Sequence, residues 1–363
     1  HAAEQGIAVI QALGEPTEAL ARDEIYLQNL VAEASRAIEG YASPRVLSAL
    51  ARTQALAARH GGVAEQMQRA LGEWAARSSA GDYEAAEGPG DAYVRLARAE
   101  GAEGALGLAH MILVTRYRQG DLAGAEAAFE SGEPYFHHVD FLRQQGVAGQ
   151  VYGSAAKVAW LLGRSDEAMR RSDLGCSVSR ATGNPYDLVY ARHMAAQLYV
   201  LRGESAVAEK LAAENIAAAE ANGYRSLASL TRITCGRALA ALGRAEEGER
   251  MLEAALFGTG ERRIRASQTL YLSWLAEARA MAGDAARAAA VIEEALAVNP
   301  RELYVRPEML RIRGDFRRTE GDEDGAAADY RAAVDLARSI GAEAWLRRAQ
   351  SSLAALERTG GRA

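Results

Sequence analysis

The amino-acid sequence predicts an all-α solenoid of about eight helix pairs that repeat about every 40 residues. Three observations support this prediction. Of the 363 residues, 49% are hydrophobic but only 6% are aromatic, and alanine is abundant, which favours closely packed helices over a sandwich or barrel. Glycines recur at a spacing of 38–43 residues through almost the whole chain. Small residues stand at two fixed distances from these glycines.

The first predicted element is a lone helix from Ala2 to Leu13, which precedes the repeats. Each repeat then consists of one helix, a glycine turn and a second helix. An acidic or hydroxyl residue after the glycine can cap the second helix in many repeats. The turn glycines are Gly40, Gly81, Gly120, Gly163, Gly203, Gly243, Gly283 and Gly321.

A second series of glycines lies 20 or 21 residues after the turn glycines, where a left-handed cap would close the second helix of a pair. These are Gly61, Gly101, Gly183, Gly223 and Gly341. Asn299 and Pro300 are expected to take this capping role after Gly283. A final capping helix is predicted from Ala342 to Glu357, because an open terminal pair would expose an apolar face.

Two segments interrupt the regular pattern. Pro89, between Gly88 and Gly90, falls inside a predicted second helix, which should therefore kink or start late, near Asp91. The step of 43 residues into Gly163 indicates a lengthened connection between repeats. We expect a single solenoid over residues 1–363, with less regular repeats in 1–100, regular repeats in 101–341 and the capping helix and tail in 342–363.

The small residues predict how the two helices of a pair pack. Five residues after the turn, seven of the eight repeats have alanine or glycine, and only Arg45 departs from the rule. These residues are Ala86, Ala125, Ala168, Ala208, Gly248, Ala288 and Ala326. Seven residues before the turn stand Ala156, Ala196, Gly236, Ala276 and Gly314. Small side chains at both places allow antiparallel helices to approach closely.

This pattern resembles the tetratricopeptide repeat (TPR), in a form about six residues longer than the usual 34. The resemblance includes an aromatic or aliphatic residue four positions after the alanine (Phe129, Leu252, Ile292, Tyr330) and extends from about Thr17 to Ile340. It implies a right-handed superhelix whose first helices line a concave groove.

Several segments have a more specific resemblance. They are GYASPRV (Gly40 to Val46), VYGSAAKVAWLLGRSDEAM (Val151 to Met169), GNPYDLVYA from Gly183 and LARSIGAEAWLRRAQSSLAAL near the end. They resemble the TPR region that follows the ATPase module in bacterial signalling proteins, where a winged-helix regulator or class III nucleotidyl cyclase is joined to a STAND-type ATPase. The maltose-regulator type of activator is a more distant relative.

Charge and composition narrow the functional class. The net charge of −6 gives no general attraction to a phosphate backbone, so direct nucleic-acid binding is not expected. No apolar stretch is long enough to span a membrane. The two cysteines, Cys176 and Cys235, form no CxxC motif and fit a reducing, cytoplasmic location. Because His1 opens the sequence without a leader, we expect a fragment of a longer protein.

The sequence predicts no enzyme and no cofactor. Neither Lys157 nor Lys210 is preceded by the glycine of a P-loop. The GAEGALG run at Gly101 imitates a dinucleotide-binding loop but lacks the strand that should precede it. His137, His138 and Asp140 are the only local cluster that suggests a metal, and no third ligand follows at a recognisable spacing, so no metal site is predicted.

A ligand groove is predicted from positions about 13, 10, 6, 3 and 2 residues before each turn glycine, which face the concave side in TPR proteins. Polar and aromatic residues gather there in the central repeats. The groove residues are His110, Tyr117, Arg118, Gln150, Lys157, Trp160, Tyr190, His193, Gln197 and Arg237. Lys157 and Arg237 could bind an anionic or carboxylate-bearing ligand. The alternative is a solvated inner face with internal ion pairs.

The leading hypothesis is a non-catalytic sensor or protein-interaction region of a cytoplasmic signal-transduction or transcription-regulating ATPase. Its groove would bind a peptide, a protein partner or a small inducer. A free-standing TPR scaffold or adaptor is the competing hypothesis, and a helical-repeat enzyme with an unrecognised site is a third. A P-loop in the reading frame upstream of His1 would separate the first two, and turnover by the isolated fragment would support the third.

Overall fold

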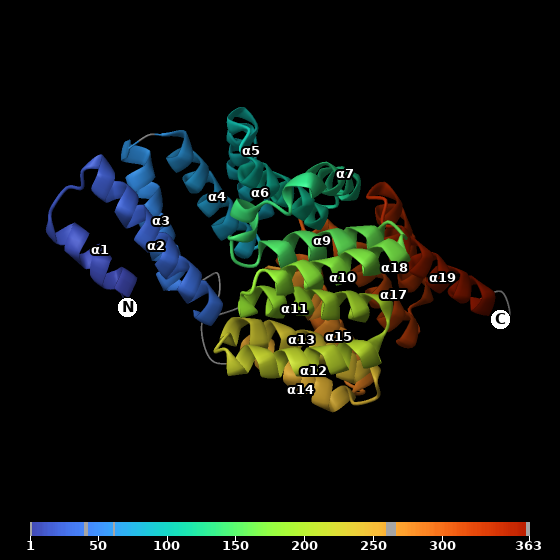
Figure 1. Cartoon of the computed structure of the whole chain (residues 1–363). Helices are drawn as coiled ribbons and strands as arrows, with labels where there is room; N and C mark the ends of the chain where they lie inside the picture. The colour runs from blue at the N-terminus through green and yellow to red at the C-terminus, as the bar shows by residue number, and fades with distance from the viewer. Residues whose placement is uncertain (1, 40–42, 61, 259–265, 361–363) are drawn as a thin grey trace.

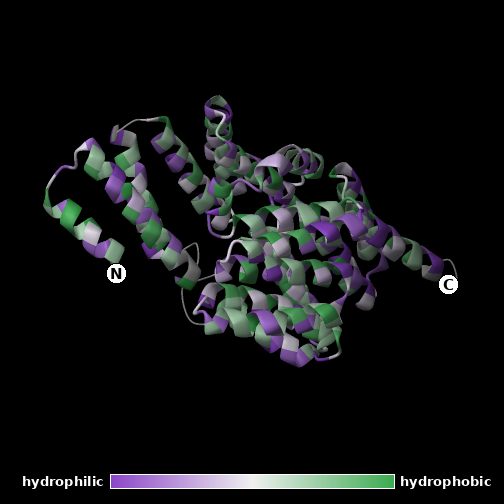
Figure 2. Cartoon of the chain, viewed as in Figure 1, coloured by the Kyte–Doolittle hydropathy of each residue, from purple (hydrophilic) through white to green (hydrophobic). Residues whose placement is uncertain are grey.

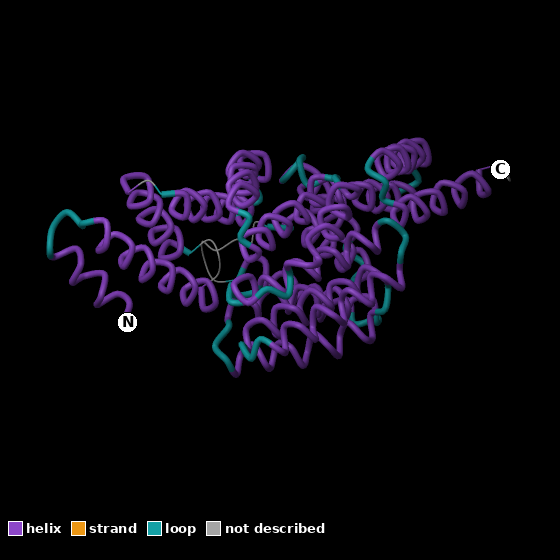
Figure 3. Tube along the Cα trace, turned by 45° about the horizontal axis from the view of Figure 1, so that its top comes forward, coloured by secondary structure: helices purple, strands orange, loops and turns teal. Residues whose placement is uncertain are grey.

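The protein is an all-helical solenoid, as predicted. The computed structural model describes residues 2–39, 43–60, 62–258 and 266–360, and within these ranges it contains nineteen α-helices, three short 3-10 helices and no β-strand (Figures 1 and 3). Helices α1 to α3 extend to one side of the larger body formed by the later repeats, and the two chain ends lie far apart (Figure 1). Hydrophilic and hydrophobic residues are interspersed along the helices (Figure 2), as expected for helices with one packed face.

The helices are α1 (Ala2–Ala12), α2 (Glu18–Glu39), α3 (Pro44–His60), α4 (Val63–Ser79), α5 (Tyr83–Glu100), α6 (Glu103–Val114), η1 (Thr115–Gln119), α7 (Leu122–Gly132), η2 (Glu133–Tyr135), α8 (Val139–Leu142), α9 (Val147–Leu161), α10 (Ser165–Ala181), α11 (Pro185–Arg202), α12 (Ser205–Ala221), α13 (Arg225–Ala241), α14 (Ala245–Phe257), α15 (Gln268–Met281), α16 (Ala285–Val298), η3 (Leu303–Val305), α17 (Arg306–Thr319), α18 (Glu323–Ser339) and α19 (Glu343–Gly360).

The predicted glycine turns connect eight helix pairs, from α2 and α3 to α17 and α18. Seven turn glycines have φ between 75° and 92°, a left-handed conformation that glycine adopts without steric cost. The eighth, Gly40, and the cap glycine Gly61 lie outside the described residues. The other four cap glycines also have positive φ. Asn299 has φ of −146°, so the left-handed cap predicted there is wrong, although α16 does end at Val298.

The predicted lone first helix and the final capping helix are confirmed as α1 and α19, the latter ending at Gly360. The late start of the proline-containing helix is wrong. Helix α5 begins at Tyr83, where the Asp82 carboxylate accepts a hydrogen bond from the Ala85 N–H at 3.2 Å, and it continues through Pro89. The lengthened connection before Gly163 is confirmed and contains η2 and α8.

Small residues at the predicted positions allow the two helices of a pair to pack closely. A Cβ atom on Gly248 would lie 2.3 Å from the carbonyl oxygen of Gly236, and a Cβ on Gly236 would lie 2.7 Å from the carbonyl oxygen of Gly248. Any side chain at either position would therefore separate α13 from α14. The equivalent alanines in the neighbouring repeats, Ala208 and Ala288, are fully buried.

The solenoid curls until repeats far apart in the sequence touch. The side chain of Asn299 donates a hydrogen bond to the Gly81 carbonyl at 2.7 Å, and the Tyr83 hydroxyl donates to Glu302 at 3.0 Å. The rings of Trp160 on α9 and Trp345 on α19 also meet edge to face, with centroids 4.7 Å apart. These contacts join repeats that are far apart in the sequence.

Candidate functional site

The first helices of the central repeats bring most of the predicted groove residues to the solenoid axis, where they are buried. Lys157 on α9 is only 3% exposed, and Tyr117 on η1 is 0% exposed. His193 and Gln197 on α11 are also buried. Lys157 is therefore not the surface residue that the sequence analysis assumed. Whether these residues bind a ligand stays a prediction.

Lys157 is held by uncharged partners. Its ammonium group donates a hydrogen bond to Gln197 Oε1 and lies 3.8 Å from the sulfur of Met194. The amide of Gln197 donates to the Tyr271 hydroxyl at 2.8 Å. Burial, together with the positive charge of Arg118, lowers the pKa of Lys157 to about 7. This lysine is thus close to losing its proton at neutral pH.

His193 lies beside the same amide. Its Nε2 is 3.1 Å from Gln197 Nε2, and its Nδ1 is 3.4 Å from the Thr231 hydroxyl. Burial and the nearby charge of Lys157 lower the pKa of His193 to about 3. His193 is therefore neutral at pH 7, and its Nε2 can accept a hydrogen bond from the Gln197 amide.

Arg118 is surrounded by tyrosines. Its guanidinium carbon lies 5.9 Å from the ring centre of Tyr83 and 5.8 Å from that of Tyr117. Its Nε atom is buried without a hydrogen-bond partner, and among the described residues no carboxylate lies within 4.0 Å of its guanidinium. Burial raises the pKa of Tyr83, Tyr117 and Tyr304, so these phenols are neutral hydroxyl groups at pH 7.

The hydroxyls of Tyr117 and Tyr304 belong to the same cluster as Arg118. The rings of Tyr117 and Tyr304 meet edge to face at 5.0 Å, and both residues are almost completely buried. The Tyr304 hydroxyl forms no hydrogen bond with any described residue, whereas Arg118 and Ser154 lie close enough to the Tyr117 hydroxyl to lower its pKa against the effect of burial. A buried donor without a partner costs about 1–3 kcal/mol. Arg118 Nε and the Tyr304 hydroxyl are two such groups, and they lie where η1 meets η3.

We call the group formed by Tyr83, Tyr117, Arg118, Lys157, Tyr271, Glu302 and Tyr304 the axial cluster. Glu302 is its acidic member. It accepts hydrogen bonds from the Tyr83 hydroxyl and from the Thr269 hydroxyl. Burial raises its pKa, while these hydrogen bonds and the charge of Arg118 act in the opposite direction. The cluster thus contains two basic side chains, Arg118 and Lys157, and one carboxyl group.

The remaining predicted groove residues lie elsewhere. Arg237 forms a bidentate ion pair with Glu277, with both N–O distances at 3.0 Å. His110 is held by the Ala128 carbonyl, with its Nδ1 at 3.0 Å from the oxygen. Tyr190 donates a hydrogen bond to Gln150. Trp160 packs against Trp345, as described above.

Sequence reasoning missed four members of the cluster. Tyr271 precedes its turn glycine by 12 residues, one residue away from a counted groove position. Tyr83 starts a second helix, and Glu302 and Tyr304 stand in a connection between repeats. No periodic signal marks these last three positions.

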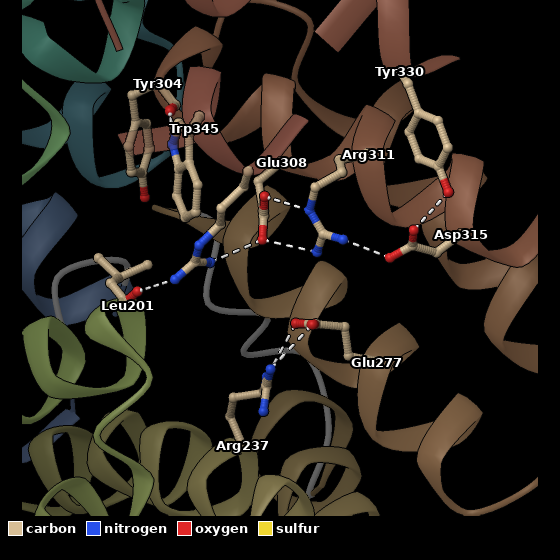
Figure 4. A network of polar contacts seen from close by, with 10 residues as sticks. Leu201, Arg237, Glu277, Tyr304, Glu308, Arg311, Asp315, Tyr330 and Trp345 are labelled. Atoms are coloured by element: carbon tan, nitrogen blue, oxygen red, sulfur yellow. Dashed lines mark hydrogen bonds and ion pairs between the residues drawn. The ribbon is translucent and has the colours of Figure 1, made fainter. Parts of the chain in front are cut away.

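A neighbouring part of the axis is electrostatically balanced (Figure 4). Glu308 pairs with Arg311 at 2.8 Å and with Arg348 at 3.0 Å, and Arg311 continues to Asp315 at 2.5 Å. Arg237 and Glu277 lie beside this network (Figure 4). Together these six side chains carry three positive and three negative charges, in contrast to the axial cluster around Arg118.

Arg118 and Tyr83 also line a narrow cavity of about 20 Å³ between α4, α5, α6 and η1. A cavity of this size holds about one water molecule. Trp74 and Gly90 contribute to its wall, and a Cβ on Gly90 would lie 3.1 Å from Trp74 Cδ1. The glycine beside Pro89 thus keeps this cavity open.

The histidine cluster near His138, which suggested a metal site, and the glycine-rich run at Gly101, which suggested a dinucleotide site, have structural roles. Within the described ranges, no three His, Cys, Asp or Glu side chains gather as metal ligands. His138 accepts a hydrogen bond from the Asp140 N–H and caps α8. A Cβ on Gly104 or Gly107 of the glycine-rich run would come within 3 Å of the α8 side chains.

Cys235 is a buried free thiol. None of the described helices is long and apolar enough to cross a membrane.

Comparisons with known proteins show similarity in fold only. No protein-family model matches the chain, and no curated protein matches it in sequence. Among solved structures, a Rap protein complexed with competence and sporulation factor is similar, with a TM-score of 0.56, 9% identity and coverage of 94% of this chain and 99% of that one. This likeness shows a shared solenoid fold.

Two other solved structures are more distantly similar. A tetratricopeptide repeat protein from Parabacteroides merdae has a TM-score of 0.45 and 17% identity, and covers 81% of this chain and 99% of its own. A signal-transduction ATPase with numerous domains and a tetratricopeptide repeat sensor, from Pyrococcus horikoshii, has a TM-score of 0.49 and 15% identity. The match covers 95% of this chain and 50% of the other one.

Proposed function

We propose that the chain is a non-catalytic sensor or protein-interaction region of a cytoplasmic ATPase that acts in signal transduction or transcription regulation. Its ligand, a peptide, a protein segment or a small inducer, binds on the inner face of the solenoid. The specific resemblance of segments such as GYASPRV to the TPR regions of such ATPases supports the regulatory setting.

One observation carries the binding role. The axis of the solenoid contains buried basic and phenolic groups that lack full sets of partners, although apolar side chains would fill the same space at lower free energy. Proteins retain such groups mainly where they have a function. The first helices α9 and α11 contribute Lys157, His193 and Gln197 to this face.

The similar Rap protein was solved in complex with competence and sporulation factor, which supports a ligand-binding role for a solenoid of this shape. A free-standing scaffold or adaptor remains the second candidate, because paired helices with a long inner face serve both roles. The reading frame upstream of His1 separates the two. A P-loop there supports the ATPase setting, and its absence from the complete reading frame refutes that setting.

Peptide selection followed by hydrogen exchange tests the binding role. Peptides are selected from a random-sequence phage library on the purified chain, and their affinities are measured by fluorescence anisotropy. We expect a selected peptide to slow amide exchange in α9, α11 and α13. The second helices α10, α12 and α14 of the same pairs serve as the matched control. Protection confined to these second helices, or a failure to select any peptide or inducer, would refute the proposal.

A further inference from the structure

The C-terminal part of the chain contacts the turns of distant helix pairs. Asn299 bonds to the turn of the second pair, as described above. A Cβ on the turn glycine of the third pair, Gly120, would lie 3.2 Å from Leu303 Cβ. A Cβ on that of the fourth pair, Gly163, would lie 3.0 Å from Cγ of Glu343, the first residue of α19. Among the described residues, no atom beyond the chain neighbours comes within 4 Å of a Cβ built on the turn glycines of the last four pairs. The C-terminal contacts are therefore confined to one side of the repeat array.

Arg348 on α19 lies at the centre of these contacts. It donates hydrogen bonds to the Leu201 carbonyl at 2.6 Å and to the Glu308 carboxylate at 3.0 Å. Its guanidinium carbon lies 5.6 Å from the ring centre of Trp160 and 5.0 Å from that of Trp345. A guanidinium at this distance from an indole ring is attracted by the electrons of the ring. One side chain thus links α19 to α9, α11 and α17.

The contacts of Arg348 lie beside the buried inner face. Lys157 stands three positions before Trp160 on α9, and residues three or four positions apart share a face of a helix. In the same way, Gln197 stands four positions before Leu201 on α11. Lys157 is 3% exposed and Gln197 is 2% exposed, so a ligand can touch them only when contacts that cover them part. The contacts of α19 are one helical turn away.

These contacts can part without unfolding the repeats. They join segments that are distant in sequence, so their loss leaves the two helices of every pair packed against each other. The side chain of Arg348 is already 39% exposed. A further link, the ion pair of Arg301 with Glu84, is at the surface and contributes little to stability. Separation of α19 from α9 and α11 is therefore a local opening.

We infer that α19 is a latch over the inner face, held by Arg348 and Trp345, and that a ligand reaches α9 and α11 when this latch opens. The inference rests on the proposed ligand-binding function and adds its regulation. Because only the open fraction of the protein can bind, a closed latch weakens the apparent affinity in proportion to that fraction. Weakening the latch should therefore tighten ligand binding.

Labelling of an introduced thiol tests the latch without any ligand. Ser154 on α9 is fully buried one turn before Lys157, and Ser179 on α10, the second helix of the same pair, is equally buried. The background is the complete 363-residue chain with Cys176→Ser and Cys235→Ala. In it, Ser154→Cys reports opening of the inner face, and Ser179→Cys is the matched control. The rate of reaction with a chromogenic disulfide reagent is followed by absorbance.

Arg348→Ala should speed the labelling of Ser154→Cys about tenfold, as expected for the loss of a charge-assisted hydrogen bond, and change that of Ser179→Cys less than about twofold. The control Arg313→Ala removes a bidentate ion pair with Asp329 between the adjacent helices α17 and α18, so it should not separate the two rates.

A second variant keeps the test valid if Arg348→Ala does not fold, which far-UV circular dichroism shows. Arg348→Lys retains the positive charge but lacks the planar fork that reaches both the Leu201 carbonyl and Glu308. It should therefore speed the labelling of Ser154→Cys less than Arg348→Ala does, and still more than that of Ser179→Cys.

No acceleration by either Arg348 variant, or equal acceleration of the two thiols, would overturn the inference. A peptide selected on the purified chain should also bind Arg348→Ala more tightly than the wild type, and an unchanged affinity beside faster labelling would refute the regulatory role. A peptide that protects α9 and α11, while Arg348→Ala leaves the labelling of Ser154→Cys unchanged, would keep the proposed function and refute only the latch.

Discussion

Replacing Lys157 by methionine should stabilise the protein at neutral pH and below. Methionine has a similar length and needs no counter-charge. Because the pKa of Lys157 is lowered from 10.5 to about 7 by burial, folding at low pH must transfer a charged ammonium group into the interior. The Lys157→Met variant avoids this transfer but leaves Gln197 Oε1 without its donor.

The magnitude follows from linkage between protonation and folding. One pKa unit corresponds to about 1.4 kcal/mol, so the lowered pKa corresponds to about 5 kcal/mol of lost stability below pH 7. The unfolded chain binds more protons than the folded one between pH 7 and 10.5, and the wild-type protein therefore gains stability as the pH rises through this window. The unpaired amide oxygen in the variant costs about 1–3 kcal/mol at every pH.

The variant should thus be about 2–4 kcal/mol more stable than the wild type at about pH 6, and this advantage should disappear by about pH 10. Urea denaturation followed by far-UV circular dichroism at each pH measures the difference. The only other lysine, Lys210, is exposed on α12, so Lys210→Met is the matched control and should show no pH-dependent difference. A Lys157→Met difference that stays constant with pH, or a destabilised variant at about pH 6, would refute the reasoning.

Two further predictions concern packing. Gly248→Ala should lower the free energy of unfolding by about 1–3 kcal/mol, because its Cβ would lie 2.3 Å from the Gly236 carbonyl oxygen. The control is Gly88→Ala, whose Cβ meets no atom of another helix within 4 Å, so it should lose less stability in urea denaturation. Trp345→Ala should cost about 3–5 kcal/mol, since this almost fully buried ring also donates a hydrogen bond to the Tyr304 carbonyl at 2.8 Å. Trp345→Phe should lose less, and equal losses in the two variants would contradict the importance of the buried ring.

The local part of the fold could be predicted because it depends on residues close in sequence. A positive φ at a turn glycine and a small residue five positions later are properties of one helix pair, and both recur in the seven repeats from Gly81 to Gly321. Asn299 does follow the last residue of α16, but the left-handed conformation predicted for it was wrong: its φ is −146°, and its side chain bonds to the Gly81 carbonyl in a distant repeat. Likewise, one proline did not delay α5, since Asp82 caps that helix at its regular position.

Contacts between neighbouring repeats follow the same period. Lys157 bonds to Gln197, Tyr190 to Gln150, and Arg237 to Glu277, and in each pair the two residues are 40 positions apart. Equivalent positions of successive first helices therefore face one another. The alternative of internal ion pairs, left open by the sequence, describes Arg237.

The surroundings of Arg118 could not be predicted in this way. The Tyr83–Glu302 hydrogen bond joins residues 219 positions apart, several repeats along the superhelix. Whether two such segments touch depends on the small rotation between successive repeats, added over the whole turn. A small error in each rotation would separate η1 from η3 and leave Arg118 in an open, solvated groove, as the sequence analysis assumed. The closed turn instead places Arg118, which is partly exposed, beside the buried rings of Tyr83 and Tyr117 and leaves its Nε atom without a hydrogen-bond partner. The partly buried setting of Arg118 is thus a property of the superhelix as a whole.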